Sequence, residues 1–169
     1  MIRWVGIDNG VSGSVAILDD EGNCQYYPTP IKNELNYTKT KQWVHRVDVV
    51  KLLEIFEPLK GGNVIILLER PMVNPGRFKA TTSALRALEA TLIAIEFSGL
   101  SFAYCDSKEW QKVMLPAGLE KEELKKASLD VAKRYFPNIK LKKDGDSLLI
   151  AMYAKQKFQG KASDDQKKS

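Results

Sequence analysis

The chain opens on apolar runs with the length and composition of β-strands. Two runs rich in valine and isoleucine span Arg3 to Asp8 (RWVGID) and Gly13 to Leu18 (GSVAIL). The Asn9-Gly10 pair between them suits a tight turn, so the pattern predicts a β-hairpin. A third strand over Asn23 to Tyr27 is expected after the Asp20-Glu21-Gly22 turn, extending an antiparallel meander.

Beyond this meander the pattern changes from irregular to helical and then to continuously apolar. Residues Ile31 to Lys41 have no clear period and are interpreted as a mobile loop. Apolar positions at helical spacing (Val47, Val50 and Leu53) predict a helix over Trp43 to Phe56, which Pro58 ends. The continuous apolar run Asn63 to Leu68 (NVIILL) is typical of a strand buried on both faces. We expect it at the centre of the sheet.

The second half alternates helices with one further strand. The predicted elements are a loop over Arg70 to Lys79, a helix over Ala80 to Phe97, a strand over Ser101 to Cys105, and helices from Ser107, over Lys121 to Tyr135 and over Asp146 to Phe158. This order predicts one α/β domain over residues 1–158, with a mixed five-stranded sheet flanked by helices. Three leading strands would be antiparallel and the later ones parallel. The polar, basic tail over 159–169 is expected to be disordered.

Composition narrows the possible chemistry. With 169 residues and 44% hydrophobic content, the chain suits one domain. It lacks an apolar stretch of membrane-spanning length and an N-terminal targeting pattern, so a cytoplasmic protein is expected. Cys24 and Cys105 stand apart, and the only histidine, His45, falls within a predicted helix. Zinc sites and Ser-His-Asp triads are therefore disfavoured, and hydrolytic chemistry would rely on carboxylates.

Positive charge is concentrated in one stretch of the chain. The net charge is +5, and residues 108–143 hold ten Lys or Arg against five Asp or Glu, a surplus of +5. Such a concentration is expected of a phosphate-binding face, although solvated helix surfaces explain many of these lysines equally well.

Four carboxylates occupy the ends of predicted core elements. Asp8 closes the first strand, Glu69 directly follows the apolar run, and Asp144 and Asp146 flank Gly145 before an apolar helix. Each has an ordinary explanation: a turn former, a partner for Arg70, or a helix cap. Together they match the oxygen ligands that a pair of magnesium ions requires.

An ordered set of motifs resembles RuvC-type Holliday junction resolvases of the ribonuclease-H-like superfamily, phage-type members included. The set comprises Gly6-Ile7-Asp8 followed by Gly13 and Ala16, Glu69 after an apolar strand, the Gly76 to Ser83 loop, and Asp146-Ser147-Leu148-Leu149-Ile150-Ala151. The resemblance covers residues 1–158. It implies a homodimeric endodeoxyribonuclease that cleaves Holliday junctions, with two Mg²⁺ ions in each active site and Mn²⁺ as a substitute.

The resemblance implies four acidic residues, of which Asp8, Glu69 and Asp146 transfer directly. The family's commonest pattern places another acid three residues before Asp146, where this sequence has Lys143. Asp144 is the nearest substitute, and Gly145 is expected to let the backbone swing its carboxylate into the site.

The resemblance also indicates contacts to branched DNA, meaning four-way junctions and possible forks and flaps. Lys125 and Lys126 lie in a helix that resembles the family's basic element, and Lys142 and Lys143 adjoin the acids. In the loop after Glu69, Phe78 is interpreted either as a base-stacking residue or as a staple onto the following helix. The full set of predicted DNA-binding residues is Arg77, Phe78, Lys79, Lys108, Lys112, Lys125, Lys126 and Lys143.

Two other functional classes remain open at this level. Asp8-Asn9-Gly10 with Ser12-Gly13-Ser14 also resembles the phosphate-binding hairpin of actin, Hsp70 and sugar kinases. Those ATP-binding proteins need two large lobes, for which this chain is too short. A catalytically silent nucleic-acid-binding protein that retains the fold without the complete acid set is the other alternative, which Lys143 leaves open.

Overall fold

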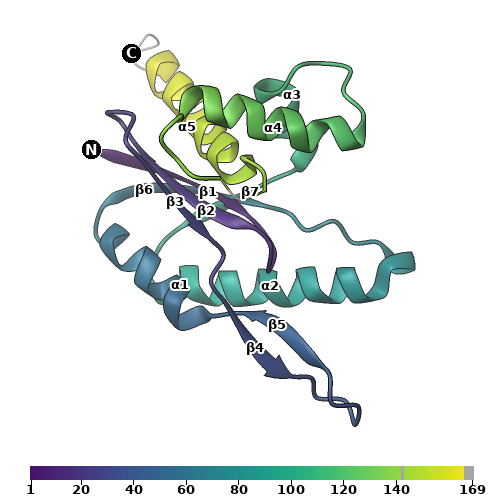
Figure 1. The fold of residues 1–169 in the computed structure, drawn as a ribbon. Coiled ribbons are helices and arrows are strands. Elements are labelled where there is room, and N and C mark those ends of the chain that lie inside the picture. Colours follow the sequence, from purple (N-terminus) through teal and green to yellow (C-terminus); the bar gives the residue numbers. More distant parts are fainter. Residues whose placement is uncertain (142, 166–169) are drawn as a thin grey trace.

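A mixed five-stranded sheet forms the centre of the protein (Figure 1). The computed structural model describes residues 1–141 and 143–165. The strands are β1 (Ile2–Asp8), β2 (Ser14–Asp19), β3 (Cys24–Pro28), β6 (Asn63–Glu69) and β7 (Phe102–Cys105), in the order β3-β2-β1-β6-β7. The pairs β1–β2 and β2–β3 are antiparallel, whereas β1–β6 and β6–β7 are parallel. The predicted sheet is confirmed.

Helices cover both faces of this sheet (Figure 1). On one face, α1 (Val49–Phe56) and α2 (Phe78–Phe97) pack on a core that includes Val5, Ile7 and Leu68. On the other, α3 (Ser107–Met114), α4 (Lys121–Tyr135) and α5 (Asp146–Asp165) pack on a core that includes Trp4 and Leu67. Because successive strand residues point to opposite faces, these continuous apolar strands supply both cores. Two short 3₁₀ turns, η1 (Glu57–Leu59) and η2 (Pro75–Arg77), complete the elements.

A second hairpin replaces the loop predicted over 31–41 and the first part of the helix predicted over 43–56. Strands β4 (Ile31–Leu35) and β5 (Trp43–Val47) pair antiparallel, with Leu35 opposite Trp43. Helix α1 begins only at Val49, because the Asp48 side chain caps it by accepting a hydrogen bond from the Lys51 amide. Val47 supplied part of the helical period, but it is buried as the last residue of a strand.

His45 also lies in β5 rather than in a helix, and it hydrogen-bonds Asn33 on the opposite strand. Helix α2 begins at Phe78, two residues before its predicted start, and α5 continues past Phe158 to Asp165. Residues 159–165 of the predicted disordered tail therefore belong to α5, whereas residues 166–169 lie outside the described residues and disorder there stays a prediction. Within the described part of the chain, every helix is too short or too polar to cross a membrane.

Candidate active site

Two acidic residues meet at one edge of the central sheet. Strands β1 and β6 are parallel neighbours with Ile7 opposite Leu68, so Asp8 and Glu69 end side by side. Their carboxyl groups share a hydrogen bond. The buried Trp110 indole donates a second hydrogen bond to Glu69 Oε1 at 3.0 Å. Arg70, the alternative partner of Glu69, instead pairs with Asp106 at 3.4 Å.

The start of α5 carries the other two acids to the same edge. Helix α5 lies directly on β1 at Gly6, where an added Cβ would stand 2.1 Å from the Ser147 carbonyl oxygen and 2.4 Å from the Ala151 nitrogen. A buried hydrogen bond of 2.7 Å joins the hydroxyls of Ser14 and Ser147. Since Ser14 pairs with Asp8 in the sheet register, this bond fixes the start of α5 beside Asp8.

Helix α4 holds the residues that precede α5. The Ser128 hydroxyl oxygen accepts a hydrogen bond from the Gly145 amide at 3.1 Å, and the hydroxyl donates to the Asp146 carboxylate. The backbone freedom of Gly145 was expected to place the Asp144 carboxylate in the site. The φ of Gly145 is not positive, so its glycine has another role. A Cβ there would lie 2.2 Å from the Ala132 Cβ, so glycine is needed for close packing. The result is a buried Asp144 facing the strand-end acids.

The geometry of the four acids fits hard divalent cations. One carboxylate oxygen from each of Asp8, Asp144 and Asp146 lies within 4.8 Å of the others. Glu69 lies outside this trio but contacts Asp8 through the shared hydrogen bond. Mg²⁺ and Mn²⁺ prefer oxygen ligands, and the set offers only oxygen donors.

Burial raises the pKa values of Asp8, Glu69 and Asp146 above the ordinary carboxyl range. For Asp8, loss of hydration is the largest cause, and the negative charges of the other three acids add to it. Burial raises the pKa of Asp146 from 3.8 to about 6, against the opposing effects of the Ser128 hydrogen bond and the Lys125 charge. Bound protons or cations therefore stabilise this cluster.

These raised pKa values predict a pH-dependent stability in the metal-free protein. A carboxyl group whose pKa is raised by folding binds more protons in the folded state, so its contribution is lost as pH rises. For Asp146 the window runs from about pH 4 to about pH 6. One unit of pKa shift equals about 1.4 kcal/mol. After a reduction for partial solvent screening, the free energy of unfolding is expected to fall by about 2 kcal/mol across this window.

The measurement is urea unfolding in EDTA at both ends of this window, for the wild type and Asp146→Asn. Glu34 and Glu109 act in the opposite direction because hydrogen-bonded partners lower their pKa values. Only the difference between the two proteins therefore isolates Asp146. A wild type that gains stability relative to Asp146→Asn as pH rises would contradict the prediction, and added Mn²⁺ should reduce the pH effect.

Several residues around the acids were not recognised in the sequence as supports of the site, and Ser14 was noted only within the Ser12-Gly13-Ser14 motif. Trp110, Ser128 and Ser14 reach the site from α3, α4 and β2. Tyr26 on β3 is a further neighbour, since burial raises its pKa and the charges of Asp144 and the other aspartates add to this effect. They were not recognised because their roles depend on contacts between distant segments.

The eight predicted DNA-binding residues are all exposed but lie in different places. Lys143 and Lys125 lie near the acids: the Lys143 ammonium is 3.5 Å from the Ser12 hydroxyl, and the Lys125 charge lowers the pKa of Asp146. Phe78 is 76% exposed at the start of α2, so the staple interpretation is wrong. Lys142 lies outside the described residues. The remaining five are Arg77, Lys79, Lys108, Lys112 and Lys126.

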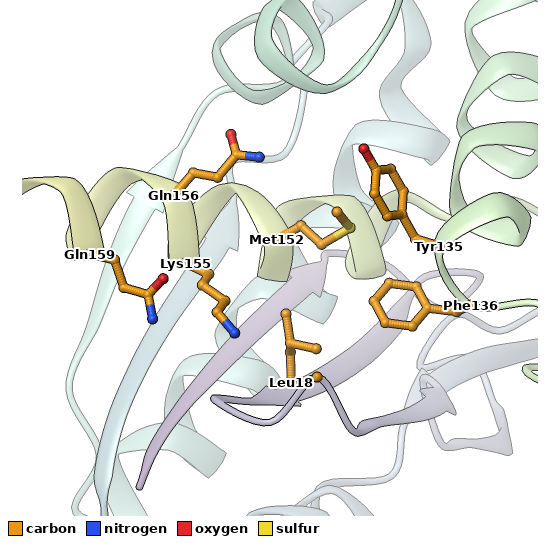
Figure 2. Close-up of a pocket in the computed structure, with 8 residues that line it drawn as sticks. Leu18, Tyr135, Phe136, Met152, Lys155, Gln156 and Gln159 are labelled. Atoms are coloured by element: carbon orange, nitrogen blue, oxygen red, sulfur yellow. The ribbon is translucent and has the colours of Figure 1, made fainter.

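The four acids line neither of two cavities in the structure. A cavity of about 360 Å³ lies between α5 and the end of α4, where Leu18, Phe136 and Met152 face one another (Figure 2). A larger groove of about 690 Å³ lies between the β4–β5 hairpin and α2. The acids lie instead at the sheet edge, an arrangement compatible with a large substrate.

Comparison with solved structures places this geometry in a known fold. The chain resembles RuvC from T. thermophilus in complex with a Holliday junction substrate, with a TM-score of 0.59 and 14% identity over 94% of this chain and 98% of the other. A second Thermus thermophilus RuvC structure gives a TM-score of 0.50 and 15% identity, covering 89% and 90% of the two chains. No protein-family model and no curated protein sequence matches. The chain therefore has the ribonuclease-H-like fold of RuvC.

Proposed function

We propose that this protein is a metal-dependent endodeoxyribonuclease that cleaves Holliday junctions and other branched DNA. The observation that carries the proposal is the acidic cluster of Asp8, Asp144 and Asp146, with Glu69 hydrogen-bonded to it, at the sheet edge of a RuvC-type fold. Buried or partly buried carboxylates with raised pKa values favour cation binding, and such perturbed groups concentrate at functional sites.

The chain's own residues would hold and orient the reacting groups. Asp8, Glu69, Asp144 and Asp146 would supply oxygen ligands, while Trp110 and Ser128 fix two of these carboxylates through hydrogen bonds. Two Mg²⁺ ions, or Mn²⁺ in their place, would activate water and stabilise the leaving oxygen when bound. Lys125 and Lys143 would hold the phosphate backbone against this cluster.

Substrate selection would rest on the exposed residues farther from the acids. Arg77 and Lys79 flank Phe78 at the start of α2, so this short segment offers two cations and one aromatic ring to the DNA. Lys108, Lys112 and Lys126 would add phosphate contacts. A homodimer would present two active sites to the two strands of a four-way junction. Exposed apolar residues of α2, such as Leu85 and Phe97, suit a place in that interface.

A cleavage panel tests the proposed function. Labelled four-way junctions, forks, flaps and linear duplex are incubated with the protein in Mg²⁺, Mn²⁺ or EDTA. We expect symmetric cuts in junctions with either metal, slower cutting of linear duplex, and no cutting in EDTA. Tight junction binding without cleavage in either metal would identify a silent binding protein instead, and ATP hydrolysis would favour the kinase-like class.

A further inference from the structure

The β4–β5 hairpin projects from the main sheet (Figure 1). Its residues form one wall of the groove on α2. Hairpin residues from Asn36 to Val47 and helix residues from Phe78 to Ile93 line this groove. Val11 also lines it, and Val11 belongs to the turn that directly follows Asp8. One part of the groove therefore lies beside the turn that follows Asp8.

The hairpin is strongly cationic for its length. Residues 31–47 contain Lys32, Lys39, Lys41 and Arg46 against Glu34 alone, a surplus of +3. Glu34 pairs with both Lys32 and Arg46 on the strands. Among the described residues, Lys39 and Lys41 at the tip are exposed and make no ion pair. The tip of the hairpin thus presents two exposed ammonium groups.

Exposed aromatic rings lie among these cations. Tyr37 is 93% exposed at the tip and lines the groove, and Trp43 is 69% exposed. Alternate residues of β5 share one face. His45 and Trp43 share one face of β5, whereas Val44 and Arg46, which also line the groove, lie on the other face. Trp43 does not itself line the groove, and neither do Lys39 and Lys41; these residues alternate along the hairpin with the lining residues Thr38, Thr40 and Gln42.

The opposite wall has matching chemistry. Lys79 and Arg86 on α2 line the groove against one carboxylate, Glu89. Thr82 and Ser83 add hydroxyl groups on the same helix, and Thr38 and Thr40 add them on the hairpin. Hydroxyl donors, cations and exposed aromatic rings together are the chemistry that recognises a single-stranded nucleic acid, through phosphate contacts and base stacking.

We propose that this groove, with the hairpin tip, binds an unpaired nucleic-acid strand that extends from the acidic edge. The proposal rests on the proposed nuclease function and adds a second anchoring site to it. Tyr37 and Trp43 would stack on bases, while Lys39 and Lys41 would contact phosphates. The hairpin would thereby select substrates whose branch point carries single-stranded DNA over fully paired junctions.

Tryptophan fluorescence provides a direct test, because Trp4 and Trp110 are buried and Trp43 is the exposed tryptophan. A thymidine oligonucleotide and a four-way junction with a single-stranded tail are titrated in EDTA, which prevents cleavage. We expect quenching of the Trp43 emission by both DNAs and weak quenching by linear duplex. Trp43→Phe should abolish the response while keeping most of the affinity.

Variants that remove positive charge provide a second test of the groove. Lys39→Ala/Lys41→Ala should weaken oligonucleotide binding about tenfold and reduce the slope of log K against log salt by about 1.4, since each single-strand phosphate contact contributes about 0.7. Lys51→Ala/Lys60→Ala removes the same charge from exposed positions outside the groove and should leave the slope unchanged. Tyr37→Ala should weaken binding about tenfold through lost stacking.

The outcomes separate this proposal from the nuclease function. Junction cleavage with unchanged Trp43 emission, and equal salt slopes for the two double variants, would overturn the groove assignment and leave the nuclease standing. Quenching by oligonucleotide without any junction cleavage would support the groove and overturn the nuclease. Trp43 emission that changes with protein concentration in the absence of DNA, and not on adding DNA, would show that a second copy covers the hairpin and would overturn the proposal.

Discussion

Asp8→Asn is expected to lower the rate of junction cleavage about a thousandfold or more while leaving junction binding nearly unchanged. The Asp8 carboxylate lies within 4.8 Å of the Asp144 and Asp146 carboxylates and also contacts Glu69. An amide keeps the shape of the side chain but loses the negative charge that a divalent cation requires. A loss of about 4 kcal/mol in transition-state stabilisation corresponds to this factor.

The readouts are single-turnover cleavage in Mg²⁺ and junction affinity in EDTA. Asp130→Asn is the matched control, because it makes the same change of charge at an exposed position of α4. Burial and the neighbouring acids raise the pKa of Asp8, so Asp8→Asn should also raise the melting temperature of the metal-free protein near pH 7. A variant that melts earlier and no longer binds junctions would show that Asp8 has a structural role instead.

The strand-end acids were predictable because apolar runs mark where buried strands stop. The runs before Asp8 and Glu69 end at the positions where β1 and β6 end, and parallel neighbours end at one edge. The start of α5 at Asp146 was also predicted, since an apolar helix follows it directly. Local patterning thus identified the elements that carry these three acids.

The supporting residues were not predictable, because their roles arise only when distant segments meet. Trp110 follows Glu69 by 41 residues, and Ser128 precedes Asp146 by 18, yet each forms a hydrogen bond with its acid. Gly145 was interpreted through its backbone freedom. In the structure, a glycine is required at this position because Ala132 of α4 packs so closely that a side chain would clash. The pattern of residues along the chain does not show which side chains of distant segments contact each other in the fold.

The β4–β5 hairpin was missed for a related reason. Its strands are too polar for an apolar run, and their stability depends on cross-strand pairs such as Leu35 with Trp43 and Asn33 with His45. Val47 is the last residue of β5, and it fitted a helical period only because the apolar spacing of α1, which begins at Val49, extends back to it. Strand preference depends strongly on such context, so short polar hairpins are the elements that single-sequence patterns identify least well.

Gly6→Ala is expected to destabilise the folded protein by about 4 kcal/mol or more and to abolish cleavage. The added methyl group would stand 2.1 Å from the Ser147 carbonyl oxygen and 2.4 Å from the Ala151 nitrogen. Both are backbone atoms of α5, which cannot rotate away as a flexible side chain does. Relief of the clash requires α5 to move off β1, at a cost at the upper end of that measured for overpacked cores.

Thermal unfolding in EDTA and in Mn²⁺ measures the effect, with Gly62→Ala as the control. The Gly62 Cβ would stand 3.3 Å from the Leu59 carbonyl oxygen, which needs a shift of only a few tenths of an ångström, so that variant should have a much smaller effect than Gly6→Ala. For a chain of this size, Gly6→Ala should lower the melting temperature by about 10 °C or more. Moving α5 also separates Asp146 from Asp8, so the folded remainder should gain less stability from Mn²⁺ than the wild type. An unchanged melting temperature would contradict the direct packing of α5 on β1, and with it the positioning of the acidic cluster.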